Sequence, residues 1–357
     1  MLRIQFTSRD LNRLRVSPGP DPLWEVALTL HLLQNRQAAL VFDPWRREVR
    51  TAIARAGLEE TVASLIRLCP FAAYFPDFLT PAPGTTDLET GIDRVLSTPA
   101  PRIGREVARL YGPGRIPAGA RRLAAGDAGA LGRLGEGLRR YYAVAVEPYL
   151  AAIGPVVAAD RPLRAEAALA GGPDGLLASY RPDLSWREED RVLEASYPVR
   201  WDLPLGGRPL TMVPAFFCVR FPVALADPLL PPVLVHPVTP LPGWLERFRA
   251  AERNAAAGPG PVAHLIGHTR AAVLDVLERP LTTTQLGSAL RLALSTASRH
   301  ATVLREAGLI SSERRGPSVV HRRTRLGDAL MTGVAGGRAG VSHGGRSGAV
   351  ALRSAAS

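Results

Sequence analysis

Residues 282–310 read TTTQLGSALRLALSTASRHATVLREAGLI, and residues 311–324 continue as SSERRGPSVVHRRT. Apolar residues recur at helical spacing on both sides of a short break at residues 291–293, which predicts two helices joined by a turn. The residues predicted to hold these helices together are Leu286, Ala289, Leu290, Ala297, Ala301, Val303 and Leu304. Gly308 stands where a helix commonly ends in a left-handed residue.

A basic hairpin is predicted to follow the helix pair. Residues 310–314 and 318–323 resemble two strands around Arg315-Gly316-Pro317, whose glycine and proline favour a tight reversal. Helix, turn, helix and hairpin, in this order, allow a protein to place one helix in the major groove of DNA while the hairpin touches the backbone beside it. The alternative is a solvated helix face beside an ordinary charged hairpin.

The outward face of the second helix and the hairpin supply the predicted DNA-binding residues. Ser and Thr reach phosphates or bases, and Arg can hold guanine with two hydrogen bonds. The predicted set is Ser295, Thr296, Ser298, Arg299, His300 and Thr302 in the helix, and Arg314, Arg315, Ser318 and Arg322 in the hairpin, with Arg323 beside them. His300 could instead fill the rear of the helix.

Residues 261–331 resemble the winged helix-turn-helix domain of the ArsR-type repressor family. The resemblance rests on HTRAAVLDVLERP, TTTQLGSAL, STASRHATVLREAGLI and RRTRLGDAL, about a fifth of the chain. It implies binding to operator DNA as a homodimer, with the helix that carries Ser298, Arg299 and His300 in the major groove. More loosely, MLRIQFTSRDLNRLR and PDPLWEVALTLHLLQ resemble the leader of some ArsR-like regulators from high-GC bacteria, which implies a sensing or dimerising role.

Two positions depart from that family pattern. The family usually has Gly at the turn and Ser as the cap of the recognition helix, where this chain has Arg291 and Ala293. Alanine cannot bond the free amides of a helix start, which costs about 1 kcal/mol. We therefore expect Ser295 to cap a helix that begins two residues later.

No metal site is predicted. The family's metal sensors use cysteine or histidine clusters, and this domain contains no Cys. His264 and His268 are four residues apart and would share one face of the domain's first helix, a spacing that suits a metal. Without a third ligand nearby, we expect them to pack.

Charge and composition favour a DNA partner and exclude several classes of enzyme. Residues 260–330 carry ten Arg against five acidic residues, whereas residues 1–259 carry 31 Arg against 27. All 44 basic residues are Arg, which also reflects a high-GC genome. A chain without Lys cannot form a P-loop, a kinase site or a Schiff base in the usual way. No hydrolase, zinc-protease or dinucleotide-binding motif occurs either, so we expect no enzyme and no cofactor.

The sequence predicts an α+β chain, with a mixed helical N-terminal domain that contains a small sheet and a C-terminal winged helix-turn-helix domain. The expected boundaries are 1–257, a linker at 258–261, 262–332, and a disordered basic tail at 333–357. Helices are expected at about 22–34, 44–56, 58–68, 87–97 and 127–153. Three carry start signals: Asp21-Pro22, Asp43-Pro44, and a capping box at Thr86 and Glu89.

The expected sheet lies mostly in the second half of this domain, where eleven prolines between Pro198 and Pro242 forbid long helices. Strands are expected at 192–197, 210–213, 215–221 and 233–237, with Gly206-Gly207 as a hairpin turn and residues 2–6 joining the sheet.

Tryptophan and cysteine leave two interpretations open. Trp24, Trp45, Trp186, Trp201 and Trp244 could line an apolar pocket for a small-molecule effector, or could simply fill the core. Cys69 and Cys218 are expected to be buried small hydrophobes, and two such cysteines without a signal peptide fit a reducing cytoplasm.

These features together predict a cytoplasmic bacterial transcriptional regulator, a repressor that binds double-stranded DNA as a homodimer and does not contact a membrane. Two other classes stay open. One is an enzyme with an unrecognised N-terminal site, and the other is a nonspecific nucleoid-binding protein.

Overall fold

The computed structural model describes the whole chain except residues 82–86, 113, 257–259, 316–317 and 333–357. The chain divides into two compact units, Met1–Glu246 and Arg247–Ser357, which we call the first and the second unit. Helices and strands occur in both, so the mixed α+β class is confirmed. The expected tail at 333–357 lies outside the described residues.

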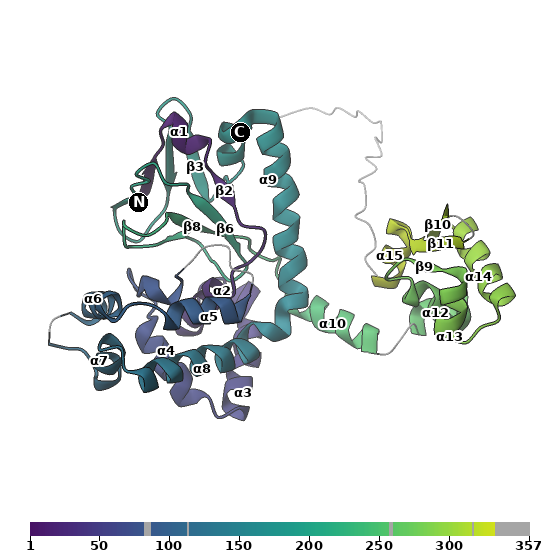
Figure 1. Ribbon diagram of the computed structural model, residues 1–357, viewed down its shortest axis with the longest axis horizontal. Coiled ribbons are helices and arrows are strands. Elements are labelled where there is room, and N and C mark those ends of the chain that lie inside the picture. The colour runs from purple at the N-terminus through teal and green to yellow at the C-terminus, as the bar shows by residue number, and fades with distance from the viewer. Residues whose placement is uncertain (82–86, 113, 257–259, 316–317, 333–357) are drawn as a thin grey trace, which may run out of the picture. The chain divides into compact units, whose positions relative to one another are not determined.

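Among the described residues in the first half of the first unit, seven helices form a helical layer (Figure 1). They are α2 (Pro22–Gln34), α3 (Ala39–Arg55), α4 (Glu59–Leu68), α5 (Leu88–Leu96), α6 (Ala100–Tyr111), α7 (Ala118–Ala124) and α8 (Ala128–Ala145). Helix α2 begins as predicted, because the Asp21 carboxylate accepts the amides of Leu23 and Trp24. Its residues are buried almost all round, as expected of a central core helix.

Three starting signals in this layer gave different outcomes. Helix α3 begins at Ala39 and not at Pro44, so the predicted start was wrong. The Asp43 carboxylate binds Arg46 at 2.6 Å instead of capping a helix. Helix α5 is capped by Asp87, which accepts the amide of Thr90 at 2.8 Å, while Thr86 lies outside the described residues.

The predicted helix at 127–153 is two helices. Helix α8 begins directly after its cap, Asp127, close to the predicted start, but it ends at Ala145, and a short 3-10 turn, Glu147–Tyr149, separates it from α9 (Leu150–Ala178). By length and composition, Ala128–Ala178 is the one described stretch apolar enough to cross a membrane. Core helices of soluble proteins pass the same test, so this is weak evidence.

The strands of the first unit form two four-stranded sheets where the sequence predicted one. The first has the order β3 (Leu184–Arg187), β4 (Val192–Ala195), β1 (Leu2–Gln5), β5 (Trp201–Asp202). The second has the order β2 (Arg15–Val16), β6 (Thr211–Ala215), β8 (Val233–Pro237), β7 (Val223–Ala224). A short helix, α1 (Ser8–Leu11), separates β1 from β2.

Strand β1 joins a sheet as predicted, pairing antiparallel with β4 and parallel with β5. Two other expectations were wrong. Gly206-Gly207 makes no hairpin, since β5 and β6 lie in different sheets and β6 pairs parallel with β8. The strand expected at 215–221 does not form. Strand β6 ends at Ala215, because the amides of the next two residues, Phe216 and Phe217, bind the Glu25 carboxylate at 2.8 and 3.1 Å.

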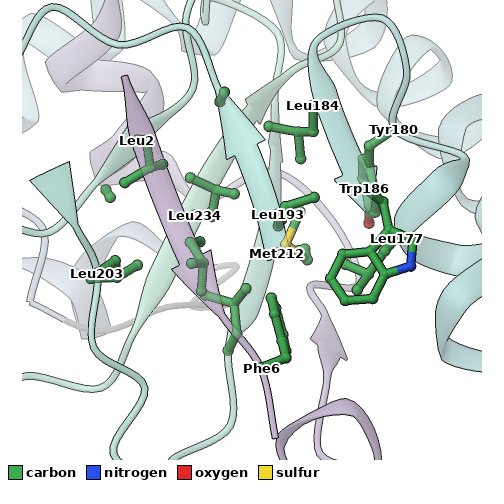
Figure 2. Close-up of a cluster of buried hydrophobic side chains, with 14 of the residues drawn as sticks. Leu2, Phe6, Leu177, Tyr180, Leu184, Trp186, Leu193, Leu203, Met212 and Leu234 are labelled. Carbon is green, nitrogen blue, oxygen red and sulfur yellow. The ribbon is translucent and has the colours of Figure 1, made fainter. Parts of the chain in front are cut away.

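One buried cluster joins the two sheets to the end of α9 (Figure 2). Leu2, Leu184 and Leu193 come from the first sheet, and Met212 and Leu234 from the second. Just beyond the first sheet, Phe6 meets Trp186 edge-on with ring centroids 5.5 Å apart, and α9 adds Leu177. Alternate residues of β1 and β3 are buried, so each of these strands presents one face to this core.

The second unit contains five short helices and a three-stranded sheet among its described residues, after the end of α10 (Trp244–Ala256), which spans the boundary between the units. They are α11 (Gly260–Ile266), α12 (His268–Val276), β9 (Leu281–Thr282), α13 (Thr283–Leu290), α14 (Leu294–Glu306), β10 (Ile310–Arg315), β11 (Ser318–Arg323) and α15 (Arg325–Thr332). The linker expected at 258–261 is partly wrong, because Gly260 and Pro261 belong to α11.

A separate core holds this unit together. Its fully buried members are Val273, Leu274, Leu277, Leu286, Ala297, Ala301, Leu304, Leu309 and Ile310. Two residues expected there, Ala289 and Val303, are exposed. The core stripe of α14 is therefore narrower than predicted, which leaves more of the helix surface open to a partner.

Candidate nucleic-acid interface

The turn between α13 and α14 is built without the glycine that such turns favour. Thr282 and Gln285 form a reciprocal capping box at the start of α13. At its end, Arg291 adopts a left-handed conformation with φ 52° and ψ 40°, and the Leu292 amide bonds the Gly287 carbonyl at 2.8 Å. A Cβ atom at Gly287 would lie 3.0 Å from the Leu292 oxygen, so helix and turn approach closely here.

Helix α14 begins at Leu294 with Ala293 at the cap position and no side-chain cap. The prediction that Ser295 caps a later start was therefore wrong. Leu292 and the turn fix the entry of the chain, so the helix forms despite the missing cap. Ser295 is instead exposed on the first turn of the helix, where it is open to a ligand.

Ala297, Ala301 and Leu304 form the buried stripe of α14. At 100° per residue, Ser295, Arg299 and Thr302 lie on the opposite side of the helix. Ser298 is exposed at one edge of this outer face, and Thr296 is half-buried at the other. The outer face thus combines small hydroxyl groups with one guanidinium, and Glu306 follows at its far end.

His300 lies on the flank of the helix and is half-buried, in keeping with the interpretation that it fills the rear. Burial lowers the pKa of His300, and the nearby guanidinium groups of Arg270 and Arg299 lower it further. The lowered pKa favours the neutral imidazole, so the positive charge of the outer face of α14 comes mainly from Arg299.

The hairpin is fixed to α13 by a buried histidine. Strands β10 and β11 pair from Ile310↔Arg323 to Arg315↔Ser318, and β9 adds a third strand against β11. His321 is buried, and its ring nitrogens lie 2.9 Å from the Thr283 hydroxyl and 2.7 Å from that of Ser312. These contacts tie both strands to the first residue of α13. No sequence pattern predicted β9, which is only two residues long.

The antiparallel register separates the hairpin's arginines into two faces. Arg322 lies opposite Ser311 and Arg315 opposite Ser318, so these four residues share the face away from His321. Arg314 shares the face of His321 but is exposed near the tip. Arg315 lies 3.2 Å from Glu313 in an exposed ion pair. Such a pair contributes little to stability, so Arg315 can exchange Glu313 for another anion.

Arg323 is not available for DNA in the way the sequence suggested. Its side chain is 12% exposed, its Nε lies 3.5 Å from Asp328, and an Nη donates to the Asp275 carbonyl. Arg323 therefore links β11 to α12 and α15. Arg314, Arg315 and Arg322 remain exposed, as does Ser318.

The other predicted polar sites give no metal or redox centre among the described residues. His264 and His268 lie in different helices, since Gly267 with φ 87° interrupts the chain between them. No group of three or more His, Cys, Asp or Glu residues comes together in the described parts of the chain. Cys69 and Cys218 are free and buried, as expected, and burial raises the pKa of both thiols.

The tryptophans are core residues and not pocket residues. Trp24, Trp45, Trp186 and Trp244 are buried, and Trp201 is partly buried and packs against the cluster that contains Leu2 and Leu177.

Comparisons of the chain with protein-family models, curated proteins and solved structures found no match. Functional inference therefore depends on the geometry of the sites themselves.

Proposed function

We propose that the second unit is a winged helix-turn-helix domain and that the chain is a DNA-binding transcriptional regulator. The observation that carries this proposal is the outer face of α14, with Ser295, Arg299 and Thr302, beside a hairpin with exposed arginines. The element order of helix, turn, helix and wing is that of proteins that read the major groove.

The dimensions and chemistry of α14 suit this role. Thirteen residues make a helix about 20 Å long, and a helix fits a major groove about 12 Å wide. Arg299 stands in the middle of the outer face, where its guanidinium can hold guanine O6 and N7. Ser295 and Thr302, one turn to either side, can bind bases or phosphates.

The hairpin supplies contacts that do not depend on base sequence. Arg315 and Arg322 on its outer face and Arg314 near its tip would neutralise phosphates beside the groove. Thr283 and Ser312 hold His321, and this fixes the hairpin relative to α13. The proposed wing and the proposed recognition helix thus belong to one rigid core.

In the cell, the chain would act as a cytoplasmic homodimer. Two recognition helices related by a two-fold axis can enter successive major grooves about 34 Å apart. Such a dimer would occlude a promoter and so repress transcription, and the first unit would carry the signal that releases it.

Fluorescence anisotropy with the full chain tests this function. The labelled duplex comes from the region upstream of the chain's own gene, and a scrambled duplex of equal composition is the competitor. We expect Arg299→Ala to weaken specific binding about 10- to 100-fold, because a bidentate contact to guanine is worth about 1–3 kcal/mol. The matched control is Arg253→Ala, which removes an exposed arginine of α10 and should leave the affinity unchanged.

The outcomes separate the classes of protein. Preference for the upstream duplex that is lost with Arg299→Ala supports a sequence-specific regulator. Equal affinity for both duplexes would indicate a nonspecific nucleic-acid binder. Failure to bind either duplex at low salt would reject DNA binding altogether.

A further inference from the structure

A cavity of about 300 Å³ lies within the first unit. Its walls come from α2 and residues 35–37 after it, from residues 71–77 after α4, from residues 197–198, and from residues 217–226, which follow β6 and include β7. The residues that define its character are His31, Phe71, Tyr74, Phe75, Phe217 and Phe221. Phe71 is 47% exposed and Ala72 and Ala73 are exposed, so this segment forms the edge at which the cavity meets solvent.

The walls are aromatic and carry little charge. The His31 ring meets Phe71 and Phe75 edge-on, with centroids 5.9 and 5.2 Å apart. Burial lowers the pKa of His31 to about 4, so its imidazole is uncharged at neutral pH. Aromatic edges and faces arranged in this way favour another aromatic ring.

Among the described residues that line the cavity, Asp77 is the one acidic side chain, and none is an arginine. The carboxylate already accepts the Ala226 amide at 3.0 and 3.1 Å and the Asp227 amide at 2.8 Å. It is therefore engaged in holding residues 217–226 in place. An anionic ligand would find no cationic partner in the lining.

Tyr74 belongs to the wall of the cavity, but its hydroxyl oxygen is enclosed by protein atoms. The Arg109 guanidinium covers its ring at 4.2 Å from the centroid and also donates to the Ala226 carbonyl at 3.3 Å, which fixes the ring. The hydroxyl is therefore out of reach of a molecule in the cavity.

We propose that this cavity binds an uncharged two-ring aromatic molecule, its rings against Phe71, Phe75 and Phe217. The volume sets the size, because an apolar cavity of about 150 Å³ in another protein holds one benzene ring. The inference concerns ligand binding by the first unit alone and does not depend on DNA binding.

Isothermal titration of the full chain with 2-naphthol at pH 7 tests the proposal. We expect one saturable site per chain, and at least tenfold weaker binding of 2-naphthalenesulfonate, which has the same rings and a negative charge. Ala73→Trp should obstruct the edge of the cavity and lower 2-naphthol affinity at least tenfold. Ala54→Trp, at an exposed alanine of α3 outside the cavity, is the matched control and should bind as wild type does.

No saturable binding of 2-naphthol to the wild type would overturn the proposal. So would equal binding of the sulfonate, or equal binding by Ala73→Trp and Ala54→Trp.

Discussion

Glu25 is a buried carboxyl group at the junction between the helical layer and the second sheet. Its two oxygens accept the amides of Phe216 and Phe217, which ends strand β6 and starts the segment that lines the cavity. Burial raises the pKa of Glu25 from its usual 4.5 to about 7, despite these two hydrogen bonds. The folded chain therefore binds this proton more tightly than the unfolded chain does.

We predict that Glu25 makes the first unit less stable as pH rises. Its folded pKa is above its unfolded value, so the stabilisation is present below about pH 4.5 and is lost by about pH 7, at most about 3 kcal/mol. Urea unfolding of wild type and Glu25→Gln at pH 5 and pH 8 checks this. The stability advantage of the wild type over the variant should shrink at the higher pH.

The comparison with a variant is needed because other groups also titrate. Asp77, with a pKa raised to about 6, adds a loss of the same sign, whereas His31, with a pKa lowered to about 4, adds a gain. Glu59→Gln, at an exposed position of α4, is the control and should give a difference that does not depend on pH. A constant difference for Glu25→Gln as well would contradict the prediction.

Two neighbouring arginines of the hairpin should differ in what they do. Arg322→Ala should reduce the slope of log affinity against log salt by about one, because the phosphate contact proposed for this exposed arginine is lost. Arg323→Ala should leave that slope unchanged and lower the stability of the second unit, because Arg323 binds Asp328 and the Asp275 carbonyl. Anisotropy over a salt series and thermal unfolding measure the two effects, and equal slopes for both variants would rule out the assignment.

At the scale of elements, the end of α9 shows how glycines position a core residue. Gly171 and Gly172 leave the helical conformation, the latter with φ 59° and ψ −149°, which only glycine adopts readily. The chain then brings Leu177 into the core of Figure 2. At Gly175, an added Cβ would lie 2.4 Å from the Ala167 carbonyl oxygen, so the two sides of the kink touch.

We predict opposite effects for two Gly→Ala changes in this one helix. Gly175→Ala should lower the free energy of unfolding by about 1–3 kcal/mol, because the backbone must move apart. Gly154→Ala, where an added Cβ meets nothing within 4 Å, should raise it by about 0.5–1 kcal/mol through helix propensity. Urea unfolding followed by fluorescence compares them, and a stabilising Gly175→Ala would show that the kink is not packed as described.

Two local signals of the same kind, each an aspartate followed by proline, predicted the start of one helix correctly and of another wrongly. Asp21-Pro22 starts α2, because the Asp21 carboxylate accepts the free amides of Leu23 and Trp24 at the helix start. Asp43-Pro44 repeats the same pattern, yet Arg46 takes the Asp43 carboxylate and the helix runs through the proline. The sequence could not distinguish these two cases, because Arg46 is held beside Asp43 by the carbonyls of Leu32 and Gln37, contacts that no local pattern predicts.

Sites built from distant segments were harder to predict. The outer face of α14 follows from helical periodicity, and its exposed Ser295 and Arg299 lie where the pattern put them. The cavity combines α2 with residues 71–77 and 217–226, and no periodic pattern links these segments. Aromatic content suggested tryptophans for such a site, whereas the walls use phenylalanine, tyrosine and histidine.

At the scale of the whole molecule, the chain consists of two units with separate cores. The cluster that contains Leu2 and Leu177 belongs to the first unit, and the cluster that contains Leu274 and Leu304 belongs to the second. The excess of basic charge differs between the two parts of the chain. Residues 260–330 carry ten Arg against five acidic residues, whereas residues 1–259 carry 31 Arg against 27. The proposed ligand site and the proposed DNA interface thus lie in parts of the chain that have cores of their own.

We predict that the two units unfold in separate transitions. All five tryptophans lie in residues 1–246, so tryptophan fluorescence reports the first unit, whereas circular dichroism reports both.

Leu274→Ala removes a fully buried side chain of the second unit and should destabilise it by about 2–5 kcal/mol. This variant should shift the circular-dichroism transition while leaving the fluorescence transition where it is in the wild type. Ile92→Ala, equally buried in α5, should shift the fluorescence transition. If Leu274→Ala moved the fluorescence midpoint as far as Ile92→Ala does, the units would unfold as one.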